Sequence, residues 1–509
     1  MISREDTWHP RYGVLPGYGI SLQDGFQDTF TATATAALEW GAFPYAKGVI
    51  DNHFRFYVQP NGGSTYRAEE VAVSSRMLTI LALYASYTGD DDFLVSHFAK
   101  AEALGNWCLY RYNISLEYPA SDPRHGIPGG DDEADTYIGI MYGDGTDWPH
   151  WYSSAGEMYR GFAELGKVWR RIGKAANRQD IAEHGAKLLA AVPGLLKSAR
   201  ASIATNTFET GDPLFPRCYS TRADQVDPSK PVCNDPTDFR AVPEMLYSGI
   251  LSRQQVDDIY MYHAHSQTGT YRPMTMGCTG YNNKQTTYIA YGMAYGLLQH
   301  DMVERFLLHF FAMAAHTYTR GTWTTPEACS PDKDVASTAY VAAGVVTAPV
   351  YLKWALVFEE PENQTVWVGK AVPRDWFGPG ETPLVAAGVP TRYGDISFTF
   401  TPPAASQRGS GGNFVMTASV QVSETFATSA LTTPAGGLRI RFRVPSAHAG
   451  KLLSATVGGK PWTDIDAAAQ TVDFAAGKLA AAAKGGLLAN IVATFAAAAD
   501  DTEAATSLL

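Results

Sequence analysis

The sequence predicts a mainly α-helical protein, in which a ring of helical hairpins is followed by a small C-terminal β-sandwich. From about residue 26 to 358, short connections alternate with long ones rich in Pro, Gly, aromatic residues and carboxylates. Within this region apolar residues recur at helical spacing, and after residue 360 they alternate as in strands. Because every second connection is long, the long ones gather at one end of the hairpins, where we expect a binding cleft.

The helical spacing is clearest at 151–172, where an apolar stripe recurs at i, i+4, i+7 and i+11, formed by Met158, Phe162, Leu165 and Trp169. Elsewhere in the chain, Gly89 is expected to end one helix and Asp90 to cap the next, and Asp301 is expected to cap another. Hairpins are predicted at 27–58, 68–111, 151–201, 241–265 and 284–319, with a single helix at 334–358. This set is one helix short of six hairpins, so we expect the missing helix upstream of Met1.

Strand-like alternation marks the C-terminal part, for example at 396–400, 415–420 and 438–444. The predicted domains are therefore a helical domain at 1–360, a β-sandwich at 361–498 and a low-complexity tail at 499–509. Because the sequence from about Ala475 is Ala-rich, it is expected to supply one or two poor strands.

Composition argues against several classes of partner. The net charge is -11 and no basic run occurs, which disfavours a nucleic acid or an anionic membrane. No apolar run of about 18 residues predicts a membrane span. The N-terminus does not read as a signal peptide, yet the sequons at Asn113 and Asn363 and the Cys218–Cys233 pair are typical of secreted proteins. Secretion and a cytoplasmic location therefore stay equally open, and the oligomeric state is not indicated.

Aromatic residues make up 12% of the chain, and many lie in loops beside carboxylates, among them Trp148 and Trp151. Such rings suit the apolar faces of sugars, so a carbohydrate is the expected substrate. The competing interpretation is that large loops bury aromatic rings to hold themselves in place.

The densest group of carboxylates lies ahead of the third hairpin, at Asp131, Asp132, Glu133 and Asp135. Because grouped carboxylates repel each other, at least one should have a raised pKa and could donate a proton. A structural Ca²⁺ site or a solvated loop would give the same pattern.

A second candidate is Glu327, which follows Pro326 and the flat platform of Trp323. A carboxylate fixed in this way before a helix could deprotonate a water molecule. The alternative is an acidic residue that is favoured by the dipole of the following helix.

A third group opens the second hairpin, where Arg67 could hold sugar hydroxyls and either Glu69 or Glu70 could be a catalytic acid. Acidic residues at a helix start are equally what the helix dipole selects. Tyr271 and Arg272 are a further candidate for substrate binding.

Other chemistries lack a motif. No nucleophile elbow, phosphate-binding loop or dinucleotide fingerprint occurs, so no cofactor is predicted. His263 and His265 have no third ligand at a zinc spacing, so no metal site is predicted.

With these loops placed, the chain resembles the six-hairpin, (α/α)6-toroid glycoside hydrolases, and among them the α-L-rhamnosidase-like group with its trailing β-sandwich. The resemblance is carried by residues 76–84 with 87–90, residues 318–323 with Glu327, and residues 373–377. It extends to about Val444, and it is more specific for fold than for activity.

The resemblance implies an inverting glycosidase with one carboxylic acid and one carboxylate base about 6.5–9.5 Å apart. Glu327 matches the position of the base, and Glu133 is the preferred acid, with Asp131, Asp132 and Asp135 as rivals. An Arg just before the acid, as in rhamnosidases, is not cleanly present. A polysaccharide lyase on a similar toroid and a non-catalytic carbohydrate-binding toroid therefore stay open.

Overall fold

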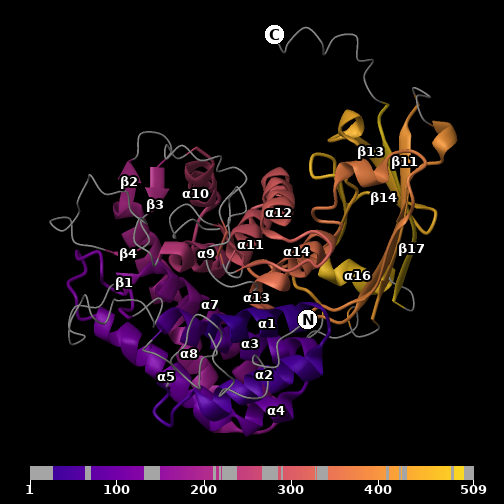
Figure 1. The fold of residues 1–509 in the computed structure, drawn as a ribbon. Helices are drawn as coiled ribbons and strands as arrows, with labels where there is room; N and C mark the ends of the chain where they lie inside the picture. The colour runs from indigo at the N-terminus through magenta and orange to yellow at the C-terminus, as the bar shows by residue number, and fades with distance from the viewer. Residues whose placement is uncertain are drawn as a thin grey trace. The chain divides into compact units, whose positions relative to one another are not determined.

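The computed structural model describes residues 27–63, 70–130, 150–209, 214–216, 219–220, 238–265, 285–287, 290–326, 328–329, 342–407, 412–423, 426, 433–482 and 486–497 (Figure 1). The chain divides into two compact units. The first contains Met1–Leu38 and Ala42–Tyr351, and the second contains Glu39–Gly41 and Leu352–Leu509. Each unit has a buried apolar core of its own. No helix in the described ranges is both long and apolar enough to cross a membrane.

The first unit is built from helices that follow one another in pairs. They are α1 (Gln27–Glu39), α2 (Phe43–Phe56), α3 (Val71–Thr88), α4 (Asp91–Ser96), α5 (Phe98–Ser115), α7 (Tyr152–Ala175), α8 (Gln179–Thr205), α9 (Asp238–Ser248), α10 (Arg253–His265), α11 (Tyr291–Gln299), α12 (Val303–Thr317), α13 (Ala342–Val345) and α14 (Thr347–Leu356), the last of which continues into the second unit. Three short strand pairs join them: β1 (His150–Trp151) with β4 (Tyr219–Ser220), β2 (Thr207–Glu209) with β3 (Leu214–Pro216), and β5 (Gln285–Thr286) with β6 (Ala328–Cys329). The predicted fold class, helical hairpins followed by a β-sandwich, is confirmed.

The predicted boundary between the helices of the second hairpin is also confirmed. Gly89 ends α3 in the left-handed conformation, with φ of 68°. The Asp90 carboxylate then accepts the backbone N–H of Phe93, which caps α4. Local hydrogen bonds therefore form this turn. An ion pair at 2.7 Å between Lys47 and Asp90 adds a contact from a distant part of the chain.

Two predicted helix ends are wrong. Helix α12 has Met302 at its cap position without a side-chain cap, because Asp301 takes a left-handed conformation with φ of 58° to make the tight turn. The helix predicted to end at 358 ends at Leu356, because Val357 and Phe358 pair with Val368 and Trp367 in a sheet. Residues 330–341, where that helix was expected to begin, lie outside the described residues.

Helices α3 and α11 are buried around their circumference, as their apolar sequence predicts. All residues of α3 from Val71 to Ala85 are buried, and so is every residue of α11. Helix α3 packs against α7, α7 against α9, and α9 against α11. These four helices therefore form a continuous wall in the interior of the first unit.

Glycines let the helices of this wall approach closely. A Cβ added at Gly161 of α7 would lie 2.5 Å from the carbonyl oxygen of Ser75 in α3. One added at Gly292 of α11 would lie 1.8 Å from the carbonyl oxygen of Pro243 in α9. Because real Cβ atoms do not approach backbone oxygens this closely, these positions fix the distance between neighbouring helices.

Gly292→Ala is expected to destabilise the protein by about 1–3 kcal/mol, because its methyl group would push α11 away from α9. Urea denaturation measures the effect. The matched control is Gly477→Ala in helix α16 (Ala476–Ala482), where an added Cβ meets nothing within 4 Å and Ala favours the helix. Equal stability of the two variants would show that the close approach does not constrain the wall.

The second unit is a sandwich of two sheets. The strands are β7 (Val357–Glu360), β8 (Thr365–Val368), β9 (Leu384–Val389), β10 (Ile396–Thr401), β11 (Phe414–Val422), β12 (Leu438–Arg441), β13 (Leu452–Val457), β14 (Lys460–Trp462), β15 (Ile465–Asp466), β16 (Thr471–Phe474) and β17 (Leu487–Phe495). One sheet has the order β14-β13-β17-β11-β10-β9 and the other β15-β16-β12-β8-β7. Alternate residues of β10 and β11 are buried, so each of these strands turns one face to the core.

Strand β17 corrects the expectation of poor strands in the Ala-rich C-terminal segment. It lies inside the six-stranded sheet and pairs with both β11 and β13. Leu488, Ile491, Ala493 and Phe495 are buried there. Pairing on both sides compensates for the low strand propensity of its alanines, which a local reading of the sequence does not detect.

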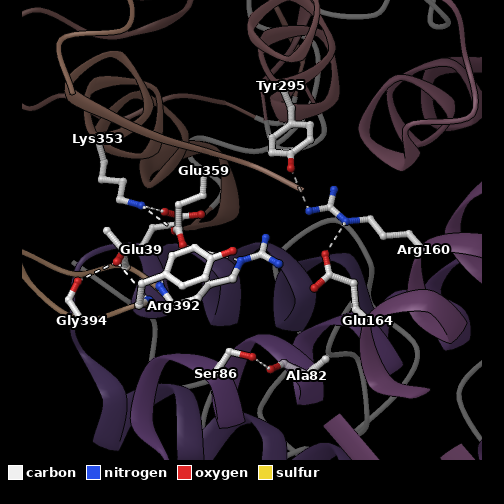
Figure 2. Close-up of polar contacts among 12 residues, drawn as sticks. Glu39, Ala82, Ser86, Arg160, Glu164, Tyr295, Lys353, Glu359, Arg392 and Gly394 are labelled. Carbon is white, nitrogen blue, oxygen red and sulfur yellow. Dashed lines mark hydrogen bonds and ion pairs between the residues drawn. The ribbon is translucent and has the colours of Figure 1, made fainter. Parts of the chain in front are cut away.

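A buried cation stabilises the second unit where the chain enters the sandwich. Lys353 is 1% exposed and forms ion pairs with Glu39 and, at 3.3 Å, with Glu359 (Figure 2). Burial opposes its charge, but the two carboxylates outweigh this and raise the pKa of Lys353. The backbone N–H of Arg392 donates to Glu359 at 2.8 Å. The buried ammonium group is therefore compensated on more than one side.

Stability of the first unit is expected to fall as the pH drops from about 6.5 to about 4, because burial lowers the pKa of several histidines, most strongly those of His53, His150 and His184. The pKa of His53 falls to about 3, and those of His150 and His184 to about 4. In this window the unfolded chain binds protons that the folded chain does not. His150 and His184 should therefore each lower the free energy of unfolding by up to about 3 kcal/mol. Urea midpoints measured across this range for the native protein and for His184→Gln test the effect. The variant should depend less steeply on pH, and an unchanged slope would contradict this account.

Candidate functional site

The four wall helices of the first unit contain a group of charged and aromatic residues, most of which are buried. We call this the buried polar layer. Its members are Arg76 of α3, Glu157, Arg160 and Glu164 of α7, Glu244 and Tyr247 of α9, and Tyr291 and Tyr295 of α11. Each of these helices is entered from one of the long connections that the sequence analysis singled out.

Arg76 and Glu157 form the central ion pair of the layer. The Arg76 Nη2 atom donates to Glu157 Oε1 at 2.6 Å, and the two side chains are 3% and 0% exposed. The Arg76 guanidinium also lies over the rings of Tyr291 at 4.4 Å and Tyr247 at 5.0 Å. A planar guanidinium group can bind a carboxylate and aromatic faces at the same time. Arg76 therefore connects α3 with α7, α9 and α11.

Arg160 makes a second set of contacts, one turn further along α7. It donates to the Tyr247 carbonyl oxygen at 2.7 Å and to the Tyr295 hydroxyl at 3.1 Å, and it lies 3.7 Å from Glu164. Figure 2 shows Arg160 between Glu164 and Tyr295, with a dashed line to each. Its guanidinium is 3.8 Å from the centroid of the Tyr247 ring, so Tyr247 contacts both arginines.

The layer contains one more carboxyl group than guanidinium groups. Glu157, Glu164 and Glu244 face Arg76 and Arg160, and Glu244 is fully buried. Burial opposes charge on Arg76, but Glu157 and Glu244 outweigh it and hold its pKa above the ordinary value. Burial raises the pKa of Glu157 although both arginines lower it. Burial and the two arginines therefore act on the pKa of Glu157 in opposite directions.

Several polar atoms of this region are buried without a hydrogen-bond partner in the part of the chain that the structure describes. They are Arg76 Nε, Glu157 Oε2, the hydroxyls of Ser153 and Ser154, and the Tyr291 hydroxyl. Most buried polar groups in folded proteins are hydrogen-bonded, so these atoms call for a partner, which an ordered water molecule or a bound ligand would supply.

Most of the sequence-predicted site residues lie outside the described residues. These are Arg67, Asp131, Asp132, Glu133, Asp135, Trp148, Tyr271, Arg272 and Glu327. Cys218 and Cys233 also lie outside them. The convergence of Glu327 with the Asp131–Asp135 group stays a prediction.

Three predicted binding residues are described. Glu70 is 2% exposed at the cap position of α3, and Trp151 is 2% exposed at that of α7. Both are therefore buried at the ends of wall helices. Trp323 is 59% exposed, with a φ of 55°, and its ring lies 5.9 Å from that of Tyr318. Of the three, Trp323 presents the open aromatic surface that a sugar ring would need.

The residues on both sides of Glu327 in the sequence belong to a hydrogen-bonded frame. Thr325 is 1% exposed, and its hydroxyl lies 3.2 Å from that of Thr287. Ala328 pairs with Thr286 across β5 and β6, and the Thr347 hydroxyl donates to the Thr287 carbonyl at 3.1 Å.

Sequence reasoning singled out the loops and missed the buried polar layer. Glu157, Arg160 and Glu244 received no functional assignment, although each is a charged residue within a buried stretch of its helix. Charged residues inside otherwise apolar helical stripes were the signal that could have found them.

No family model matches the sequence, and no curated protein matches it. The solved structures similar to it include a rhamnosidase of Bacillus sp. GL1, with TM-score 0.44, 11% identity, and coverage of 74% of this chain and 36% of that one. A metal-independent α-mannosidase structure from Streptococcus pneumoniae has TM-score 0.41, 13% identity, and coverage of 65% and 85%. A cellobiose 2-epimerase from Spirochaeta thermophila has TM-score 0.38, 13% identity, and coverage of 64% and 84%. At such identities a likeness concerns the fold alone.

Proposed function

We propose that this protein is a glycoside hydrolase that cleaves an oligo- or polysaccharide with inversion, terminal α-L-rhamnose being one candidate residue. The observation that carries the proposal is the buried polar layer, together with the buried atoms Ser153 Oγ, Glu157 Oε2 and the Tyr291 hydroxyl, which have no partner among the described residues. The helices that hold them follow connections rich in carboxylates and aromatic residues. Polyhydroxylated ligands suit such an array of donors and acceptors.

In this proposal Glu327 is the base that activates water, and Glu133 is the acid that protonates the leaving oxygen, with Asp131, Asp132 and Asp135 as rivals. The exposed ring of Trp323 and the side chains of Trp148, Tyr271, Arg67 and Arg272 bind the sugar. Glu70 and Trp151, which are buried at helix starts, shape the wall behind it.

A panel of aryl α- and β-glycosides, followed by natural polysaccharides, tests the proposal. We expect release of a single sugar from one aryl glycoside, with the inverted anomer seen first by proton NMR. Retention of configuration would refute inversion. An unsaturated product that absorbs in the ultraviolet would indicate a lyase, and saturable sugar binding without turnover would indicate a carbohydrate-binding protein.

A further inference from the structure

We propose that Ser153, Glu157 and Tyr291 bind the hydroxyl groups of one sugar ring. We call these three residues the hydroxyl-binding set. The identity of the ligand as a carbohydrate rests on the proposed function, whereas the assignment of these residues rests on their burial and on their unpartnered polar atoms.

The three side chains are buried, yet each has a polar atom without a partner among the described residues. Ser153 and Glu157 are 0% exposed and Tyr291 is 9% exposed, and the atoms concerned are Ser153 Oγ, Glu157 Oε2 and the Tyr291 hydroxyl. A buried polar group without a partner costs free energy, so its retention calls for a compensating role.

Two of the three residues contact the same guanidinium group, and the third lies one helical turn from one of them. Ser153 and Glu157 are one helical turn apart on α7, so they share a face. Arg76 holds one oxygen of Glu157 at 2.6 Å and stacks at 4.4 Å on the ring of Tyr291. The second oxygen of Glu157 is thereby oriented while it accepts nothing from the described residues.

The chemistry of the set matches neighbouring sugar hydroxyls. A carboxylate oxygen accepts a hydroxyl proton, and the Ser and Tyr hydroxyls can each donate or accept. A hydrogen bond to an ionised group is stronger than one between neutral groups, so Glu157 would be the anchor. A ring with adjacent hydroxyls can satisfy these acceptors and donors together, which an apolar ligand cannot.

Tyr295, a second tyrosine of α11, differs from Tyr291 in the partner of its hydroxyl group. The Tyr295 hydroxyl, one turn after Tyr291 on α11, accepts a hydrogen bond from Arg160 at 3.1 Å. The Tyr291 hydroxyl has no such partner among the described residues. The polar groups at the start of α11 therefore differ from those one turn further in, as expected if a ligand completes the former.

Calorimetric titration of the full chain with L-rhamnose, D-mannose and D-glucose, together with thermal denaturation, tests the inference. Tyr291→Phe and Ser153→Ala should each weaken binding of the sugar that binds the native chain by about tenfold, while the melting temperature is unchanged or raised. The matched control is Tyr84→Phe, which removes a hydroxyl outside the layer that donates to Asp90 at 2.9 Å. It should lower the melting temperature and leave affinity within about twofold.

Unchanged affinity in both Tyr291→Phe and Ser153→Ala would overturn the inference, as would the absence of saturable binding of all three sugars to the native chain. Failure of the hydrolase proposal looks different. If no glycoside is cleaved but the two variants lose sugar affinity, the hydroxyl-binding set stands without the hydrolysis. If glycosides are cleaved and the variants bind sugar as the native chain does, the hydrolase proposal stands and the assignment of the hydroxyl-binding set is refuted.

Discussion

Replacement of Glu327 by Gln is expected to lower turnover of the best substrate by about 10³-fold or more while the protein stays folded. Gln keeps the size of the side chain but cannot accept a proton, and removal of a general base typically costs between about 10² and 10⁴ in rate. Because the residue would act on water and not on the sugar, KM should change far less than kcat. Initial rates over a range of substrate concentrations, with circular dichroism as a check of the fold, provide the measurement.

Glu362→Gln is the matched control, since Glu362 is exposed in the turn between β7 and β8 of the second unit. It should retain native kinetics. Added azide, a nucleophile that needs no base, should restore product formation in Glu327→Gln and give a glycosyl azide. Full activity of Glu327→Gln without azide would refute the assignment of the base, and the carboxylates at 131–135 would then be tested in the same way.

Arg76→Ala is expected to destabilise the protein by about 3–5 kcal/mol. The change leaves Glu157 buried without its 2.6 Å partner and also removes the cation that faces Glu244. Because a typical domain is stable by only about 5–15 kcal/mol, much of the first unit's stability would be lost. Urea denaturation followed by tryptophan fluorescence and by circular dichroism measures the change.

The control is Arg171→Ala, which breaks an ion pair of the same type at the surface. Arg171 contacts Asp91 at 2.6 Å, but both side chains are 30% exposed. Solvent screening should hold its cost to about 1 kcal/mol or less. The double variant Arg76→Met with Glu157→Leu should cost less than the sum of the two single changes, because no charge of the pair is left buried alone. Additive effects would mean that the two residues do not stabilise each other.

The order and kind of the elements follow from local sequence. Apolar spacing places four of the five predicted hairpins within a few residues of their observed bounds, whereas the fifth, predicted from 284, begins at Tyr291. The change of period near residue 360 marks the start of the sandwich strands. Gly89 and Asp90 act through hydrogen bonds to residues next to them, which is why a turn of this kind can be predicted.

The sequence predicted the loop residues of the candidate site but not the buried polar layer. Its loop carboxylates follow from composition, and their roles stay predictions because Glu133 and Glu327 lie outside the described residues. The buried polar layer could not be assembled from the sequence, since Arg76 and Glu157 are 81 residues apart and lie in different hairpins. Nothing local to either residue specifies the other as its partner.

By itself, the sequence determined the alternation of helices, their capping at Gly89, and the change from helical to strand periodicity, because each depends on residues within a few turns of one another. Only the tertiary structure decided that Gly161 meets Ser75, that β17 lies inside a sheet, and that Arg76 pairs with Glu157. These contacts join distant segments, and their energies depend on burial and close packing, which exist once the chain has folded.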